Sequence, residues 1–295
     1  MTRDALQEFS CEKHERGEWN TTRYASRNRL VRLLWNYCSF KRDGVDRLAR
    51  RLGPGSLVLD AGAGTGAYAH WFAARTPCRC VAVDWSRPAL VRLMRMRPAG
   101  LIGAVCADAH YLPFKAELFD GLFSIDLLGH LTDAARALDE MSRVVKPGAE
   151  LFLHSECGDY QTRWPDRVLI RKLGEDLPAR LDGHVGLRKS TDIRRLLVRR
   201  FAIISFFSPA GIAGWLLGYP EKYRPAFARA HLRLAAAATG IFAFVKKLPV
   251  AGALLRLINA FTNHGEVYFG IQGGGSCFAS VKKPLREDGG EVNAV

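Results

Sequence analysis

An acid and three glycines stand close together in one short segment of the chain. Residues 58–66 read VLDAGAGTG, in which an apolar run ends at Asp60 and glycines follow at Gly62, Gly64 and Gly66. Glycines in a turn from a strand into a helix let a ligand approach the backbone with no Cβ in the way. The segment therefore predicts a nucleotide-binding turn, and the glycines alone fit two kinds of nucleotide.

The acid before the first glycine distinguishes between the two. Gly62, Gly64 and Ala67 fit the G-x-G-x-x-G/A pattern of dinucleotide sites, whereas Gly66 completes a G-x-G-x-G pattern preceded by an acid. A dinucleotide brings a pyrophosphate to the helix N-terminus, where Asp60 would repel it. S-adenosylmethionine carries an ammonium, a sulfonium and no phosphate. Asp60 therefore favours S-adenosylmethionine as the cofactor.

Two further acids close the next two apolar runs. Asp84 ends CVAVD and can accept hydrogen bonds from ribose hydroxyls, a role that would serve NAD equally well. Asp108 ends VCAD and can accept from an adenine amine. Any one of the three acids could simply cap a helix. All three at successive strand ends predict a ligand crevice at the carboxyl edge of an open α/β sheet.

The elements that must position these acids alternate along the chain. Strand-like runs at 56–60, 79–84, 101–107, 119–125 and 149–154 are separated by helical stretches at 66–75, 87–97 and 133–145. This alternation predicts a parallel sheet with helices on both faces. A sixth strand is expected over 201–207, and Ser190 is expected to cap the helix before it.

The flanking regions differ in character. Residues 1–20 are polar and are expected to be frayed, while helices are predicted from Tyr24 to Tyr37 and over 45–52. Residues 209–264 are alanine-rich with a helical period, and strand character resumes over 266–283. We therefore predict four parts: an N-terminal helical cap (1–52), a core (53–208 and 265–283), a helical insertion or lid (209–264) and a disordered tail (284–295).

Residues 57–154 resemble class I S-adenosylmethionine-dependent methyltransferases of the group that includes ubiquinone and menaquinone biosynthesis enzymes. The resemblance rests on VLDAGAGTG, VAVDWS, ADAHYLPF, FDGLFSIDLLGHL and EMSRVVKPGAELFLH, in this order. It implies a Rossmann-like seven-stranded sheet, with the helical insertion between strands six and seven. It also implies a cofactor site formed by residues of the first four strand ends: Asp60, Gly62, Gly64, Gly66, Asp84, Trp85, Asp108, Ala109 and Ile125.

Methyl transfer is an in-line displacement that depends mainly on positioning. Carbon or oxygen acceptors also need a base, and His130, Asp126 and His154 are the candidates near the fourth and fifth strand ends. Each could equally be a loop or capping residue. Aromatic residues outside the core suit an apolar acceptor, although most of them could simply bury area. They are Trp19, Tyr24, Trp35, Tyr37, Trp164, Trp215 and Tyr219.

The charge favours anionic partners without identifying them. The chain has 43 Lys and Arg against 29 Asp and Glu, a formal charge of +14. Within the insertion, Leu254, Leu257, Ile258 and Phe261 form one apolar face beside Lys246, Lys247 and Arg256. This combination suits either a lid over the core or a dock on an anionic membrane. The cysteines include no C-x-x-C pair, so no disulfide framework and no metal site are expected.

These features predict a cytoplasmic methyltransferase, with peripheral contact at the inner face of the membrane, that acts on carbon or oxygen of a small, apolar or lipid-like acceptor. Two alternatives remain. The LPF and SIDLLGHL segments are also similar to tRNA wobble-uridine methyltransferases, and the positive charge would suit a phosphate backbone. A catalytically silent binding subunit could also keep this fold.

Overall fold

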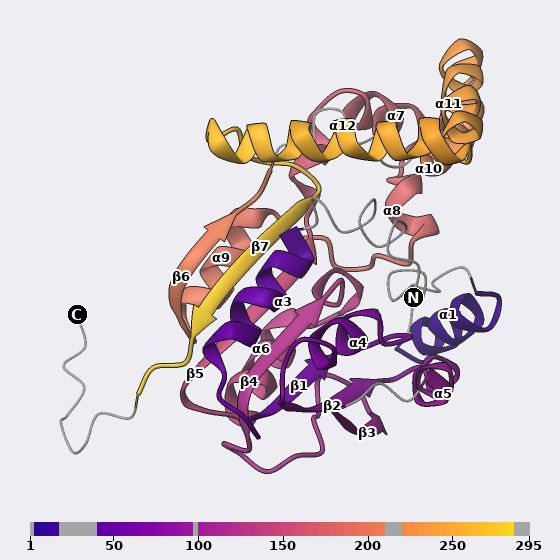
Figure 1. Ribbon diagram of the computed structural model, residues 1–295. Coiled ribbons are helices and arrows are strands. Elements are labelled where there is room, and N and C mark those ends of the chain that lie inside the picture. Colours follow the sequence, from indigo (N-terminus) through magenta and orange to yellow (C-terminus); the bar gives the residue numbers. More distant parts are fainter. Residues whose placement is uncertain (1–2, 18–39, 97–99, 210–219, 286–295) are drawn as a thin grey trace.

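The computed structural model describes residues 3–17, 40–96, 100–209 and 220–285. Its centre is a seven-stranded sheet with the spatial order β3-β2-β1-β4-β5-β7-β6 (Figure 1). The strands are β1 (Leu57–Ala61), β2 (Arg79–Asp84), β3 (Leu101–Cys106), β4 (Phe119–Ile125), β5 (Val145–Glu156), β6 (Ala202–Phe207) and β7 (Ser276–Lys282). Strands β1 to β5 pair in parallel, and β7 runs antiparallel to β5 and β6. The predicted Rossmann-like sheet is confirmed.

The chain order of the strands reverses beside β1. The chain first builds β1, β2 and β3 outward and then returns to place β4 on the other side of β1. Open α/β sheets bind ligands at such a reversal, outside the carboxyl ends of the strands. The carboxyl ends of the first five strands carry Asp60, Asp84, Asp108, Asp126 and Glu156, at or within two residues of each end. The topology therefore gathers these acids at one edge.

Helices cover both faces of the sheet, as the alternating pattern predicted. On one face α6 and α9 pack on the strands, and on the other face α3, α4 and α5 do so (Figure 1). Their bounds are α3 (Phe40–Arg51), α4 (Ala67–Ala73), α5 (Arg87–Met96), α6 (Ala134–Val144) and α9 (Ser190–Val198). The central strands are buried from both sides, which explains why β1 and β4 read as continuous apolar runs.

The N-terminal region corrects one expectation. Residues predicted to be frayed form helix α1 (Arg3–Glu15), which packs against α5 (Figure 1). Leu6, Ser10 and His14 recur every four residues and are buried on one face. Only one residue of this stripe is a large apolar side chain, so the sequence shows little helical periodicity here. The helix is stabilised by tertiary packing more than by its own sequence. The helix predicted over 24–37 lies outside the described residues.

The region after β5 is helical, with shorter elements first. Between β5 and α9 it contains the short turn η3 (Gly158–Thr162) and helices α7 (Asp166–Leu173) and α8 (Leu177–Leu181). After β6 come three longer helices, α10 (Pro220–Arg229), α11 (Arg233–Val245) and α12 (Pro249–Tyr268). Residues from α7, α8 and α10 share a small apolar core of their own. Helices α10 to α12 stand between β6 and β7 in the chain, as the predicted insertion does.

Three boundaries differ from the expectations. Helix α12 continues to Tyr268 and β7 begins only at Ser276, so the strand character expected from residue 266 is wrong. The glycines at 273–275 precede the strand instead of interrupting it. Ser190 does not cap α9 with its side chain, because the helix is preceded by Lys189 and Ser190 is its first residue. Helix α3 begins at Phe40, ahead of the expected start at Val45.

No single described helix is both long and apolar enough to cross a membrane. One pair, Arg233–Val245 with Pro249–Leu255, reaches the required length and composition only when joined, and it is bent by 114°.

Candidate functional site

The glycine-rich turn connects β1 to α4. Gly62 and Gly66 have φ angles of +80° and +81°, which side chains with a Cβ rarely adopt. A Cβ on Gly66 would lie 1.9 Å from Leu93 Cδ1, and one on Gly62 would lie 3.0 Å from Leu127. The Gly62 amide donates to the Val83 carbonyl at 2.8 Å, which ties the turn to β2. Glycine is therefore required at both positions, for backbone conformation and for space.

Asp60 lies under this turn and is 2% exposed. Its Oδ2 is buried and has no hydrogen-bond partner among the described residues. Burial raises the pKa of Asp60 well above its ordinary value of 3.8, and the nearby Asp84 raises it further. A buried carboxylate oxygen without a partner is costly unless a cation binds it. The site therefore fits a ligand that brings a positive group to the turn.

Asp84 braces the turn and keeps acceptor capacity. Its Oδ2 accepts from the Gly64 amide at 2.8 Å, and its Oδ1 accepts from the Ser86 amide at 2.8 Å. Burial raises the pKa of Asp84, while His14 on α1 acts in the opposite direction. Each carboxylate oxygen can accept two hydrogen bonds, so both oxygens have a lone pair left for hydroxyl donors. This geometry fits the predicted ribose contact, which stays a prediction.

Asp108 has partners that the sequence did not indicate. Its Oδ2 is 2.5 Å from an Arg3 guanidinium nitrogen, and its Oδ1 is 2.6 Å from His110 Nδ1. Arg3 comes from α1, and Gln7 of the same helix donates to the Trp85 carbonyl at 3.2 Å. Helix α1 therefore closes over the ends of β2 and β3, where the adenine contact is predicted. Ala109 is buried at this place.

The end of β4 carries a network of charged groups. Ile125 is buried, and Asp126 follows it with a φ of +59°. The Asp126 carboxylate accepts from Lys41 Nζ at 2.5 and 2.8 Å and lies 2.7 Å from His154 Nδ1. Burial alone would raise the pKa of Asp126, but Lys41 and His154 hold it well below its ordinary value. Asp126 is thus a stable carboxylate that positions its neighbours, and it is poorly suited to accept a proton.

His154 is inside the protein. It is 1% exposed, and its ring lies 4.6 Å from the Phe278 ring, centroid to centroid. Its Nδ1 faces Asp126, and its Nε2 is buried without a hydrogen-bond partner among the described residues. Of the three predicted bases, His154 is therefore the one with least access to an acceptor.

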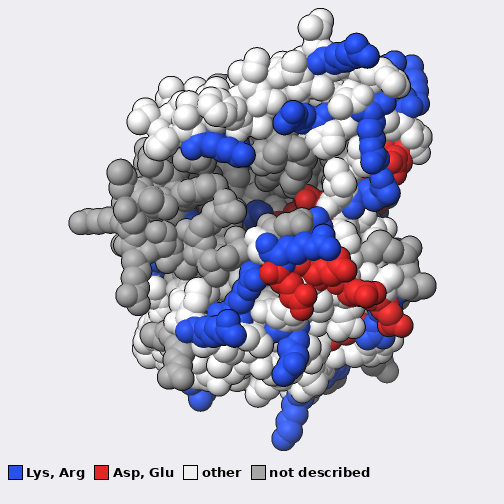
Figure 2. All heavy atoms as spheres, turned by 90° about the vertical axis from the view of Figure 1, so that its right-hand side faces the viewer, with Lys and Arg blue, Asp and Glu red and all other residues white. Residues whose placement is uncertain are grey.

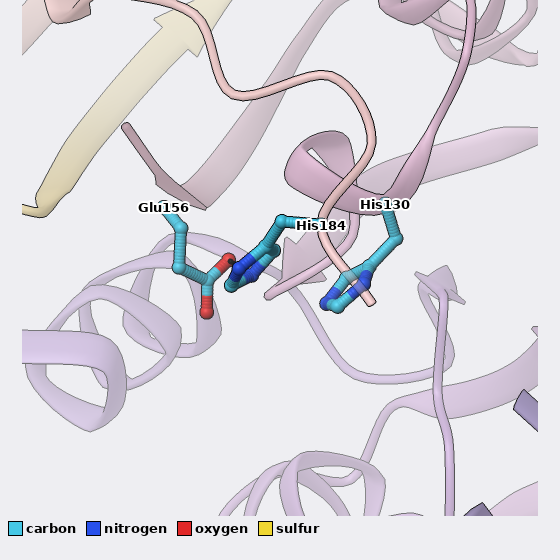
Figure 3. Close-up of side chains that lie close together, drawn as sticks. All are labelled: His130, Glu156 and His184. Atoms are coloured by element: carbon cyan, nitrogen blue, oxygen red, sulfur yellow. Dashed lines mark ion pairs between the residues drawn. The ribbon is translucent and has the colours of Figure 1, made fainter. Parts of the chain in front are cut away.

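His130 lies in a cluster that the sequence did not predict as a unit. It ends the short turn η2 (Leu128–His130) after β4, and its ring is 4.5 Å from the His184 ring. His184 Nε2 lies 3.7 Å from the Glu156 carboxylate at the end of β5. Figure 3 shows the three side chains side by side, each from a different element. Burial lowers the pKa of His130, although Glu156 acts against this shift. The ring is therefore neutral at pH 7 and able to accept a proton.

His130 lies just after β4, and the glycine-rich turn follows β1, the strand next to β4 in the sheet. The carboxyl edge can therefore hold a cationic nucleotide at the turn and a neutral base at the neighbouring strand end. This arrangement suits transfer of a group from that nucleotide to an acceptor.

Several residues of the site escaped the sequence analysis. His14 stood in the region expected to be frayed, Lys41 preceded the expected helix, and His184 stood in the loosely patterned stretch 155–187. None of them has a local signal. Of the seven aromatic candidates for the acceptor site, only Trp164 is described, and it is 67% exposed. The other six lie outside the described residues.

Comparison with known proteins agrees with this geometry. Residues 59–153 match the family model "Methyltransferase domain". The chain is 37% identical over 103 residues to the methyltransferase GfsG of Streptomyces halstedii, covering 34% of this chain and 37% of that protein. It is 36% identical over 117 residues to a demethylmenaquinone methyltransferase of Corynebacterium urealyticum, covering 37% of this chain and 49% of that protein. The chain thus spans less than half the length of each of these relatives.

A solved structure extends the likeness beyond the matched segment. The N-methyltransferase NodS of Bradyrhizobium japonicum, in complex with S-adenosyl-L-homocysteine, superposes with a TM-score of 0.52 over 93% of this chain and 98% of that chain. The two sequences are 17% identical, so this likeness is one of fold.

Proposed function

We propose that this chain, whose residues 59–153 form a class I S-adenosylmethionine-dependent methyltransferase domain, transfers a methyl group to carbon or oxygen of a small, apolar or lipid-like acceptor. The observation that carries the proposal is the buried Asp60 carboxylate under the glycine-rich turn. An anionic pyrophosphate would be repelled there, and a ligand with an ammonium group would be attracted.

Each part of the cofactor has a matching group in the chain. Asp60 is suited to the ammonium of the methionine part, and Asp84 has acceptor capacity for the ribose hydroxyls. Asp108 and Ala109 lie where adenine recognition is predicted, and there Arg3 competes for the carboxylate. When bound, S-adenosylmethionine supplies an electrophilic methyl group. We infer that α1 shifts at Arg3 when adenine binds, or that adenine uses backbone groups beside Asp108.

The chain's own contribution to the transfer step is a proton acceptor and a rigid support for it. His130 is neutral because burial lowers its pKa, and a neutral imidazole can take a proton from an acceptor. His184 and Glu156 lie behind it, and the Glu156 carboxylate favours the protonated ring. The Asp126 carboxylate holds the side chains of Lys41 and His154 in place. We therefore assign the base to His130 and supporting roles to the other two predicted residues.

The acceptor class is inferred from the helical insertion. Leu254, Ile258 and Phe261 of α12 are 43–60% exposed, and Leu257 is partly buried beside them. Lys246 and Lys247 stand at the turn between α11 and α12, while the side chain of Arg256 lies outside the described residues. An apolar face flanked by cations can bury itself in an anionic bilayer surface, with each cation adding about 1 kcal/mol. This surface supports an acceptor that is delivered from a membrane.

A basic surface also suits RNA, which is the second candidate acceptor. On the face drawn in Figure 2, lysine and arginine side chains are scattered over the helical insertion and the core, and acidic side chains lie among them. RNA recognition usually collects its cations into a groove or stripe. On this face the described cations form no single groove or stripe, which favours the lipid-like acceptor.

A labelling experiment separates the acceptors. The chain is incubated with S-adenosylmethionine that carries a labelled methyl group, together with total lipid extract or total tRNA from the source cells. We expect label in the organic phase of the lipid reaction and none in the tRNA. Label in tRNA alone would replace the lipid proposal by the RNA proposal, and no transfer to either would favour a silent binding subunit.

A further inference from the structure

Three potential metal ligands meet next to the proposed base. His130, Glu156 and His184 each offer one donor atom, and these atoms all lie within 4.8 Å of one another. They come from η2, from the end of β5 and from the segment after α8, and Figure 3 shows the His184 ring between Glu156 and His130. All three residues are partly buried. No metal site was predicted from the sequence, because its cysteines form no C-x-x-C pair. His130 and His184 are 54 positions apart, which is not a recognisable spacing for metal ligands.

The backbone holds these ligands in place. The amides of Val185 and Gly186 both donate to the Gly129 carbonyl, at 3.2 and 3.3 Å, so the segment of His184 is tied to the turn of His130. The His130 Nδ1 lies 3.3 Å from the Gly183 carbonyl, which leaves its Nε2 directed away from the backbone. Metal-binding histidines are oriented in this way, through a hydrogen bond on the ring nitrogen that is not the ligand.

The spacing of the donors is close to the spacing of ligands around a metal ion. His184 Nε2 and the Glu156 oxygen are 3.7 Å apart, which is within ion-pair range but longer than the usual limit of about 3.2 Å for an N–H···O hydrogen bond. A metal ion about 2.0–2.2 Å from each of two ligands holds them roughly 3–3.5 Å apart. Small side-chain rotations would therefore bring all three donors onto one ion.

We propose that His130, Glu156 and His184 form a binding site for a divalent first-row transition metal, with Zn²⁺ as the best match. Two imidazoles and one carboxylate are a ligand set of catalytic zinc sites, which keep at least one position open for water or substrate.

The role of the ion rests on the proposed methyltransferase function. A bound divalent metal lowers the pKa of an oxygen ligand, so the acceptor class would be a molecule with a hydroxyl group. The hydroxyl proton leaves to solvent and the oxygen forms the new bond to the methyl carbon. As this bond forms, the carbon–sulfur bond of the cofactor breaks, and its electron pair stays on sulfur. In the absence of metal, His130 would take the proton itself.

Titration with Co²⁺ and Zn²⁺ tests the site without requiring activity. The full chain is stripped with a chelator and titrated with CoCl₂ while the visible absorption of Co²⁺ is recorded, and calorimetry with ZnCl₂ gives the affinity. We expect one equivalent to bind. His184→Gln and Glu156→Gln should each weaken binding by roughly 100-fold or more, because one of three protein ligands is lost.

The control is His231→Gln, which changes an exposed histidine outside the cluster and should leave metal affinity unchanged. Thermal unfolding and S-adenosylmethionine binding of each variant show whether it is folded. No uptake of Co²⁺ or Zn²⁺ by the wild-type chain would overturn the proposal, as would folded variants that bind metal like the wild type. Because S-adenosylmethionine binding is measured separately, a chain that binds metal but not cofactor would contradict the proposed function alone.

Discussion

Replacing Asp60 by Asn should change stability and cofactor affinity in opposite directions. The substitution keeps the shape of the side chain and removes its charge. In the free protein the carboxylate is 2% exposed, and its Oδ2 lacks a hydrogen-bond partner among the described residues. Burial raises its pKa, which means that the charged form destabilises the folded state. Asp60→Asn should therefore unfold at the same or a higher denaturant concentration than the wild type.

The cofactor should respond in the opposite way. A charge-assisted hydrogen bond in a buried site contributes about 1.5–3 kcal/mol, so losing the one to the cofactor ammonium should weaken binding roughly 10- to 150-fold. Urea unfolding gives the stability, and calorimetry with S-adenosylhomocysteine gives the affinity. Asp192→Asn, which removes an exposed carboxylate in the first turn of α9, is the matched control: it should leave cofactor affinity unchanged and lower stability by at most about 1 kcal/mol, through the loss of an exposed ion pair with Arg195.

The pH dependence gives a second test of the same carboxylate. The pKa of Asp60 in the folded protein is raised above the ordinary value of 3.8, which it has in the unfolded chain. As the pH rises from the ordinary pKa to the raised one, the wild type therefore loses stability relative to Asp60→Asn. Cofactor affinity of the wild type should rise over the same interval, because the ammonium binds the charged form. Equal cofactor affinity in wild type and variant, or a large loss of stability in the variant, would refute this account of Asp60.

Three further predictions concern the rest of the site. Asp84→Ala should weaken cofactor binding by about 1–3 kcal/mol in calorimetry, because it leaves ribose hydroxyls unpaired and frees the Gly64 amide. His130→Ala should lower kcat by roughly 10²–10⁴-fold and leave cofactor affinity unchanged. Leu254→Glu combined with Phe261→Glu should abolish sedimentation with anionic liposomes and preserve cofactor binding, since both side chains are exposed on α12.

Each of these predictions has an outcome that contradicts it. Unchanged affinity in Asp84→Ala would mean that Asp84 only braces the turn. A loss of kcat below about tenfold in His130→Ala would mean that positioning carries the reaction without a base. For the liposomes, Val91→Glu with Val198→Glu adds the same charge at exposed apolar positions of α5 and α9 and should leave sedimentation intact. Loss of sedimentation in this control would show that charge alone governs the contact.

The sequence predicted the central strands because their apolar runs are continuous. Val58 and Leu59 in β1, and Leu122 and Phe123 in β4, are fully buried, so each strand end and the acid after it could be placed to within a residue or two. The seven-stranded Rossmann-like sheet was implied by the resemblance, because local patterns carry no information on which strands pair.

The outer elements were harder to predict for a physical reason. Helix α1 buries Ser10 and His14 on its inner face, and a stripe of this kind has little apolar periodicity. His184 joins Glu156 and His130 only because a loop folds back onto η2, a contact between distant residues. The ion pair of Lys41 with Asp126 is likewise set by tertiary structure. The acids and glycines at the ends of β1 to β3 could thus be placed from sequence, whereas the contacts of His14, Lys41 and His184 could not.

Calorimetric titration of the wild-type chain with S-adenosylmethionine and, separately, with NAD tests the central claim most directly. A buried carboxylate under the glycine-rich turn should accept the cationic ligand and repel a pyrophosphate. We predict binding of S-adenosylmethionine in the micromolar range, roughly −7 to −8 kcal/mol, and no heat from NAD at the same concentrations. Binding of NAD without binding of S-adenosylmethionine would contradict the account.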